Sequence, residues 1–80
     1  MKIKEAVSLR ILQLCAEKGL AINALANLAG IPPTTIYSLL SKKSANPGIV
    51  TIKKICDGLN IGVIPFFTCE LFADLEQEIE

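Results

Sequence analysis

The stretch INALANLAGIPPTTIYSLLS, which begins at residue 22, constrains the fold most strongly, because its apolar residues fit two short helices on either side of a sharp turn. Before the turn, Leu25 and Ala29 are four residues apart, and after it, Ile36 and Leu39 are three residues apart. Each pair therefore falls on one face of a helix. Gly30 stands at the bend, where the backbone favours a left-handed conformation that glycine, having no Cβ, adopts without strain. The pattern predicts a helix-turn-helix, in which two helices cross closely around a short turn.

Helical spacing recurs along the rest of the chain. A first helix is predicted to end near residues 18–19, the two helices of the turn motif to span about 21–29 and 33–41, and a fourth to run from about Val50 to Asn60. Beyond residue 62, apolar residues continue at four-residue steps, at Phe67, Leu71, Leu75 and Ile79. They predict a fifth helix, amphipathic and either continuous to the end or broken near Thr68. No strand is predicted, so the expected fold class is all-α.

The outer face of the second helix of the motif is small or polar and carries no charge. Its residues are Thr34, Thr35, Tyr37, Ser38 and Ser41. Such a face suits insertion into a groove. It also suits the solvated face of a small helical bundle, because antiparallel helix pairs are common.

The net charge is zero, but the charges are divided along the chain. Residues 1–54 carry all eight Lys and Arg and two acidic residues, whereas residues 55–80 carry six acidic residues and no base. A polyanion such as duplex DNA would meet the basic part and be repelled by the acidic end. The alternative is chance segregation among few charges.

The composition excludes several classes of protein. Eighty residues make one domain, and no run of about 18 apolar residues exists that could span a membrane. The first five residues lack the apolar core of a signal peptide, so a cytoplasmic location is expected. Three widely spaced cysteines and no histidine predict reduced thiols, with no metal and no cofactor. Neither a glycine-rich phosphate loop nor paired acids are present, so neither an enzyme nor a small-molecule ligand is expected.

From about Val7 to Phe67 the chain resembles the Cro/C1-type helix-turn-helix family of phage repressors and bacterial transcription regulators, also called xenobiotic-response-element-like. The residues that carry the resemblance are Lys18-Gly19-Leu20, Leu25-Ala26, Ala29-Gly30-Ile31, Thr35-Ile36, Leu39, Asn46-Pro47, Thr51-Ile52, Lys54-Ile55, Leu59 and Phe66-Phe67. The resemblance implies a five-helix, lambda-repressor-like fold over residues 1–67. Residues 68–80 would form an acidic amphipathic helix, either part of the same domain or a dimer contact.

In this family the third helix enters the major groove of double-stranded DNA. By match, the base-reading residues are Pro33, Thr34, Tyr37, Ser38 and Ser41. The residues expected at the DNA backbone are Asn23, Thr35, Lys42, Lys43 and Asn46, with Lys2 or Lys4 if the amino terminus lies near the duplex. Short hydroxyls discriminate bases less sharply than bidentate Arg–guanine pairs, so part of the specificity should come from DNA shape.

The resemblance further implies a homodimer on two half-sites. Two apolar surfaces could form it. The favoured one lies in the last predicted helix and comprises Phe66, Phe67, Leu71, Phe72, Leu75 and Ile79; the other comprises Leu9 and Leu12 in the first helix. Packing of the last-helix residues into the core is the alternative to a dimer contact.

The chain departs from the family at several positions. Ile22 replaces a glutamine that often bonds a phosphate, Ala21 and Pro32 replace the usual hydroxyl caps, and Leu12 and Cys15 stand where many relatives are basic. The expected function is sequence-specific binding of double-stranded DNA by a transcriptional regulator, expected to be a homodimeric repressor. The alternative is an antitoxin-like or scaffolding protein-interaction module that kept the fold without strong DNA binding.

Overall fold

The computed structural model describes residues 1–41 and 46–79. Within them the helices are α1 (Ile3–Lys18), α2 (Ile22–Ala29), α3 (Pro33–Leu40), α4 (Ile49–Gly58) and α5 (Val63–Phe67), followed by one 3₁₀ turn, η1 (Glu70–Phe72). None of these residues forms a strand. The all-α, five-helix class is therefore confirmed, and each of the first four helices lies where its spacing predicts it.

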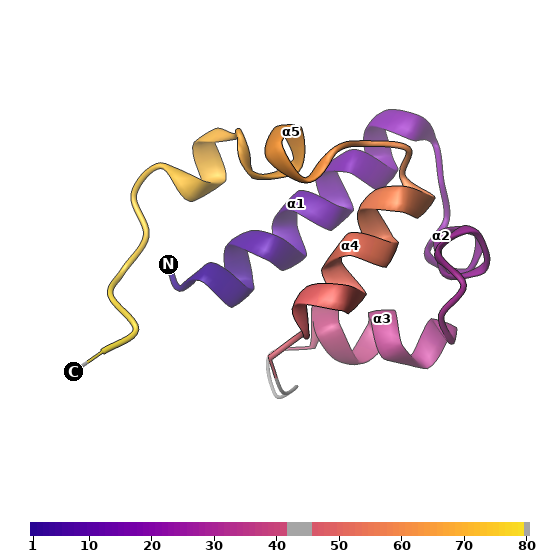
Figure 1. Cartoon of the computed structure of the whole chain (residues 1–80), viewed down its shortest axis with the longest axis horizontal. Coiled ribbons are helices and arrows are strands. Elements are labelled where there is room, and N and C mark those ends of the chain that lie inside the picture. The colour runs from indigo at the N-terminus through magenta and orange to yellow at the C-terminus, as the bar shows by residue number, and fades with distance from the viewer. Residues whose placement is uncertain (42–45, 80) are drawn as a thin grey trace.

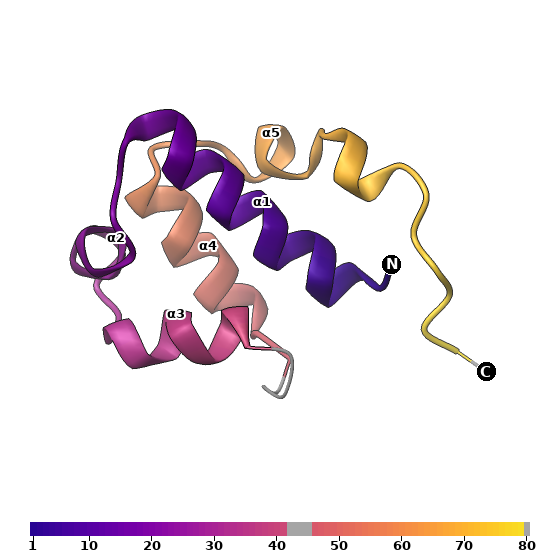
Figure 2. The ribbon, with the colours of Figure 1, turned by 180° about the vertical axis from the view of Figure 1, so that it is seen from behind.

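Figures 1 and 2 show α2 and the C-terminal segment at opposite ends of the long axis, with α1, α3 and α4 between them. The core is a single cluster to which all five helices contribute. Its fully buried large side chains are Ile11, Leu25, Ile36, Ile55, Cys56, Leu59 and Phe66. The two apolar pairs of the turn motif are also buried, as their spacing predicts.

Left-handed residues end three of the helices. Gly19 closes α1 with φ 62°, Gly30 closes α2 with φ 70°, and Asn60 follows α4 with φ 55°. Asparagine is the residue type, other than glycine, that most readily adopts this conformation. The predicted turn at Gly30 and the predicted stop at Asn60 are confirmed.

The helices α2 and α4 approach each other closely at Gly58. A Cβ added there would lie 2.9 Å from the backbone nitrogen of Ala29, the last residue of α2. The absence of a side chain at Gly58 thus lets the end of α4 pack directly against the turn that leads into α3.

The short helix α5 is held by side chains from elsewhere in the chain. Five residues cannot form a stable helix alone. Arg10 of α1 donates from Nε to the Phe66 carbonyl oxygen at 2.8 Å and from Nη2 to the Pro65 carbonyl oxygen at 2.9 Å. The Phe66 carbonyl lies at the helix end, where carbonyls lack intrahelical partners, and that of Pro65 also accepts from the Thr68 amide at 3.2 Å. Phe66 anchors the helix in the core.

The predicted amphipathic helix over residues 68–80 is wrong. The alternative of a break near Thr68 is correct, because Thr68 ends α5 and its hydroxyl donates to the Ile64 carbonyl oxygen at 2.8 Å. Of residues 69–79, only those of η1 are helical. Of the predicted apolar stripe, Phe67 packs on Phe72, with ring centroids 4.9 Å apart, whereas Ile79 at its far end is exposed. Acidic residues near a helix C-terminus oppose its dipole, so a helix here would need packing that the fold does not supply.

The residues expected at the dimer contact are accordingly scattered. Phe66 is fully buried in the core, so its assignment to a dimer surface is wrong. Leu71, Phe72 and Leu75 are half-buried, and Ile79 is 81% exposed. The alternative of core packing is correct for Phe66.

Candidate nucleic-acid interface

The helix α3 begins with two prolines. Pro32 is the N-cap residue in an extended conformation, Pro33 follows it, and the Thr35 amide donates to the Pro32 carbonyl oxygen at 3.0 Å. No side chain caps this end. Because proline lacks an N–H group, two amide donors that would otherwise need a partner are absent, and the fixed φ of proline suits the first helical turn.

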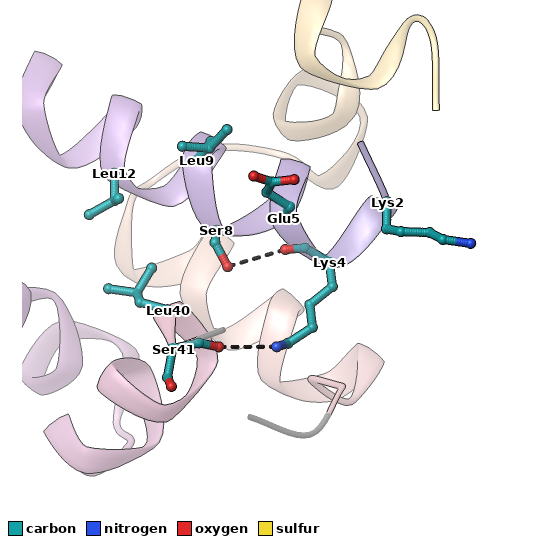
Figure 3. Close-up of a pocket in the computed structure, with 8 residues that line it drawn as sticks. All are labelled: Lys2, Lys4, Glu5, Ser8, Leu9, Leu12, Leu40 and Ser41. Carbon is teal, nitrogen blue, oxygen red and sulfur yellow. Dashed lines mark hydrogen bonds between the residues drawn. The ribbon is translucent and has the colours of Figure 1, made fainter. Parts of the chain in front are cut away.

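The other end of α3 is held by the start of α1. The Ser8 hydroxyl donates to the Leu39 carbonyl oxygen at 3.0 Å and lies 3.1 Å from the Lys4 carbonyl oxygen, and Lys4 Nζ donates to the Ser41 carbonyl oxygen at 3.1 Å. Figure 3 shows Lys4 reaching across to Ser41 above the hollow between the two helices. Sequence reasoning missed the role of Ser8, because nothing local distinguishes it from a solvated serine on a helix.

The outer face of α3 is accessible as predicted. Pro33, Thr34, Tyr37, Ser38 and Ser41 are all exposed, whereas Ile36 and Leu39 on the opposite face are buried. Thr35 is half-buried. The face therefore offers hydroxyl groups, one aromatic ring and no charge to a partner.

Two of the residues expected at the interface contact each other. The Tyr37 hydroxyl donates to Asn23 Oδ1 at 3.3 Å, joining the first turn of α2 to the middle of α3. Since the bond uses the amide oxygen of Asn23, its NH₂ group remains a donor for an anionic oxygen. Tyr37 is still 53% exposed.

A shallow hollow of about 280 Å³ brings three of the predicted residues together. Thr35 and Ser38 of α3 line it with Asn46 from the segment before α4. The other lining residues are Leu39, Pro47, Gly48 and Thr51. Two hydroxyls and an amide thus converge beside the outer face of α3, which is the chemistry that phosphate oxygens and base edges require.

The basic residues near this surface differ in their surroundings. Lys42 and Lys43 lie outside the residues that the structure describes. Lys2 donates to the Gln77 carbonyl oxygen, and Lys4 is engaged with Ser41 as described above. On α4, Lys53 pairs with Asp57. The two lysines at the start of α1 therefore contact the chain itself in this structure.

The three cysteines are free, and two of them are buried. Burial raises the pKa of the Cys15 and Cys56 thiols, so both stay protonated and act as small apolar side chains. No group of His, Cys, Asp and Glu among residues 1–41 and 46–79 could hold a metal ion. In the same part of the chain, no helix is long and apolar enough to cross a bilayer.

Comparison with known proteins identifies this arrangement. The model of a Cro/C1-type helix-turn-helix DNA-binding domain matches residues 10–64. The crystal structure of prophage Lp1 protein 11 superposes with a TM-score of 0.81 at 34% identity, over 94% of this chain and 100% of that one. The wild-type restriction-modification controller protein C.Esp1396I gives a TM-score of 0.76 at 27% identity, over 84% and 86% of the two chains. No curated protein matches.

Proposed function

We propose, on the premise that the chain belongs to the Cro/C1-type helix-turn-helix DNA-binding family, that it binds double-stranded DNA sequence-specifically as a homodimer and represses transcription in the cytoplasm. The family comprises DNA-binding regulators and not enzymes. The observation that carries the proposal is the exposed, uncharged outer face of α3, with the Thr35–Ser38–Asn46 hollow beside it. In this proposal Pro33, Thr34, Tyr37, Ser38 and Ser41 face base edges in the major groove.

The backbone contacts would flank that face. The Asn23 side chain, which lies next to Tyr37, would donate from its amide to a phosphate oxygen. Thr35 would donate from its hydroxyl in the hollow, where Asn46 lies beside it. Lys42 and Lys43 follow α3 in the sequence and would neutralise phosphates. The usual phosphate-binding glutamine is replaced by Ile22, which is half-buried and packs against the core, so the donors of Asn23 are the nearest substitute.

A single domain makes few phosphate contacts, and the proposed dimer supplies the rest. The surface that best supports it is an apolar patch formed by Ile49 and Val50 of α4 and by Val63 and Ile64 of α5. Ile49 is 84% exposed and Ile64 is 81% exposed, although both are strongly apolar. A hollow of about 490 Å³ beside them is lined by Pro47, Ile49, Ile52, Lys53, Val63 and Phe67. Isolated exposed apolar residues are common, but here Ile49 and Val63 line one hollow and Val50 and Ile64 are their neighbours in the chain, and such a group indicates a contact.

The occupant we propose for this patch is a second copy of the chain. Pro47 lines both this hollow and the Thr35–Ser38–Asn46 hollow beside α3, so the two surfaces adjoin. An isologous contact at the patch would therefore set two α3 helices next to each other on one side of the dimer, as two half-sites on a duplex require. Lys53 at the edge is already paired with Asp57, so an uncompensated charge would not oppose the contact.

The test of DNA binding is a salt series with a random-sequence duplex. Binding should weaken steeply as salt rises, because each neutralised phosphate releases counterions. The double variant Lys42→Ala, Lys43→Ala should bind about tenfold more weakly at low salt. The slope of log affinity against log salt concentration should fall in magnitude by about 1 to 2. The variant Lys18→Ala, at the distant end of α1, serves as the matched control. Absence of binding by the wild type would favour the alternative function, a protein-interaction module.

That alternative has one structural observation in its favour. Leu9 and Leu12 on α1 are 38% and 43% exposed and line, with Leu40, an open hollow of about 450 Å³ (Figure 3). A partner protein could cover these leucines without any contact to DNA. The salt series separates the two functions, because such a module would show no salt-dependent association with duplex.

The assignment of base-reading residues has its own test. The double variant Thr34→Ala, Ser38→Ala should lose about tenfold in preference for a selected operator over random duplex, since two single hydroxyl contacts together contribute about as much as one bidentate base contact, about 1–3 kcal/mol. Its affinity for random duplex should stay close to that of the wild type. Both side chains are exposed, so folding should be unaffected. Unchanged preference for the operator would show that another surface reads the bases.

A further inference from the structure

The segment 70–79, called here the acidic tail, is attached to the first residues of the chain. The Glu76 amide donates to the Met1 carbonyl oxygen at 3.1 Å, and Lys2 Nζ donates to the Gln77 carbonyl oxygen. The Glu76 carboxylate lies 3.1 Å from the Met1 α-amino group. The hydrogen bond from this amino group, together with its positive charge, lowers the pKa of Glu76, so this carboxylate is ionised at neutral pH.

The start of α1 to which the tail is attached also holds the end of α3. Lys4, two residues beyond Lys2, donates to the Ser41 carbonyl oxygen, and Ser8 donates to that of Leu39. Figures 1 and 2 both show the C-terminal end of α3 turned toward the side of the molecule that carries the N-terminus and the tail. The tail is thus connected to the proposed DNA-reading helix through a single helical turn of α1.

The tail is strongly negative on its accessible surface. Glu70, Asp74, Glu76 and Glu78 are all exposed, and the segment contains no Lys or Arg. Charges of like sign repel over the Debye length, which is about 8 Å at physiological salt. Lys2 lines one hollow with Ser41 at the end of α3, so a duplex seated on α3 would bring phosphates toward this end of the molecule, where Lys2 is engaged with the tail.

We propose that the acidic tail, by binding the first turn of α1, acts as an intramolecular brake on DNA binding, and that its release strengthens the binding. The inference rests on the proposed function. Two physical effects combine in it. The tail occupies Lys2, a cation near the proposed interface, and it adds carboxylates that repel the phosphate backbone.

The experiment compares the full-length wild type with the triple variant Asp74→Asn, Glu76→Gln, Glu78→Gln on one random-sequence duplex over a salt series. All three side chains are exposed, so the fold should be retained, which circular dichroism would verify. We expect the triple variant to bind about tenfold more tightly at low salt, because three carboxylates no longer repel phosphates. Loss of the Glu76 carboxylate also removes its ion pair with the Met1 amino group and so loosens the tail, which frees Lys2 and makes the slope of log affinity against log salt steeper by about 1. The matched control Glu17→Gln, an exposed acid near the far end of α1, should change the affinity by less than about twofold.

A fourth variant separates the brake from a general charge effect. Adding Lys2→Gln to the triple variant should remove the extra salt slope, because Lys2 is the cation that the loosened tail frees. If the wild type binds duplex and the affinity of the triple variant rises no more than that of Glu17→Gln, the brake is wrong and the proposed function stands. If neither binds any duplex, the proposed function is wrong and the brake with it.

Discussion

Replacing Gly58 with alanine is expected to destabilise the fold by about 1–3 kcal/mol, although alanine is the better helix former. In an open helix the substitution would stabilise by about 0.5–1 kcal/mol. Here the added Cβ would lie 2.9 Å from the Ala29 nitrogen and 3.1 Å from its Cα. Backbone atoms cannot rotate away as a flexible side chain would, so α4 must shift from α2, and overpacking dominates. Denaturant unfolding followed by circular dichroism measures the change.

The matched control is Gly48→Ala at the other end of the same helix. Gly48 has an ordinary φ of −73°, and no atom lies within 4 Å of the Cβ position. The free energy of unfolding should therefore change by less than about 1 kcal/mol. Equal effects at both positions would show that the close approach of α2 and α4 does not limit stability.

Placing glutamine at both Ile49 and Ile64 is expected to abolish the dimer at micromolar concentrations and to weaken DNA binding by about 100-fold or more. Both side chains are more than four-fifths exposed in the single chain, so the monomer should fold normally. In the proposed dimer each glutamine would bury an amide without assured partners, at about 1–3 kcal/mol per group, and symmetry doubles the number of groups. Sedimentation equilibrium measures the assembly, and titration with a selected operator measures the binding.

The control for this experiment is Ile79→Gln. Ile79 has the same exposed fraction as Ile64, 81%, but lies in the acidic tail, the surface that the sequence favoured for the dimer. The control should leave the dimer intact. If Ile79→Gln loses the dimer and the double variant does not, the dimer contact lies in the tail. If both remain dimeric, the contact is more consistent with the Leu9 and Leu12 face.

Most of the fold was predictable because the helices are locally determined. The pairs Leu25–Ala29 and Ile36–Leu39, the bend at Gly30 and the stop at Asn60 depend on spacing and backbone preference alone, and all are as expected. The amphipathic pattern from Phe67 to Ile79 was misleading. Periodicity records which residues could share a face, but only tertiary packing decides whether anything covers that face.

The features that sequence reasoning missed all depend on contacts between distant segments. Arg10 reads as a surface cation, but its guanidinium reaches two carbonyls at the end of α5. Gly58 reads as a helix terminator, but its missing side chain allows the close approach of α2. The candidate interface was predictable to a greater extent, because the exposed positions of α3 follow from the buried ones. The Tyr37–Asn23 bond and the Asn46 hollow required the structure.

Because α3 carries no charge, mutation could change which operator the protein prefers without changing its charge at the interface. Its helical residues, PTTIYSLL, include no ionisable group except the Tyr37 phenol, whereas the cations nearest in sequence, Lys42 and Lys43, follow the helix. Substitutions among the hydroxyl side chains could therefore redirect the protein to a new operator without changing its overall attraction to nucleic acid. Under this arrangement target choice and binding strength are separate variables that mutation can adjust one at a time.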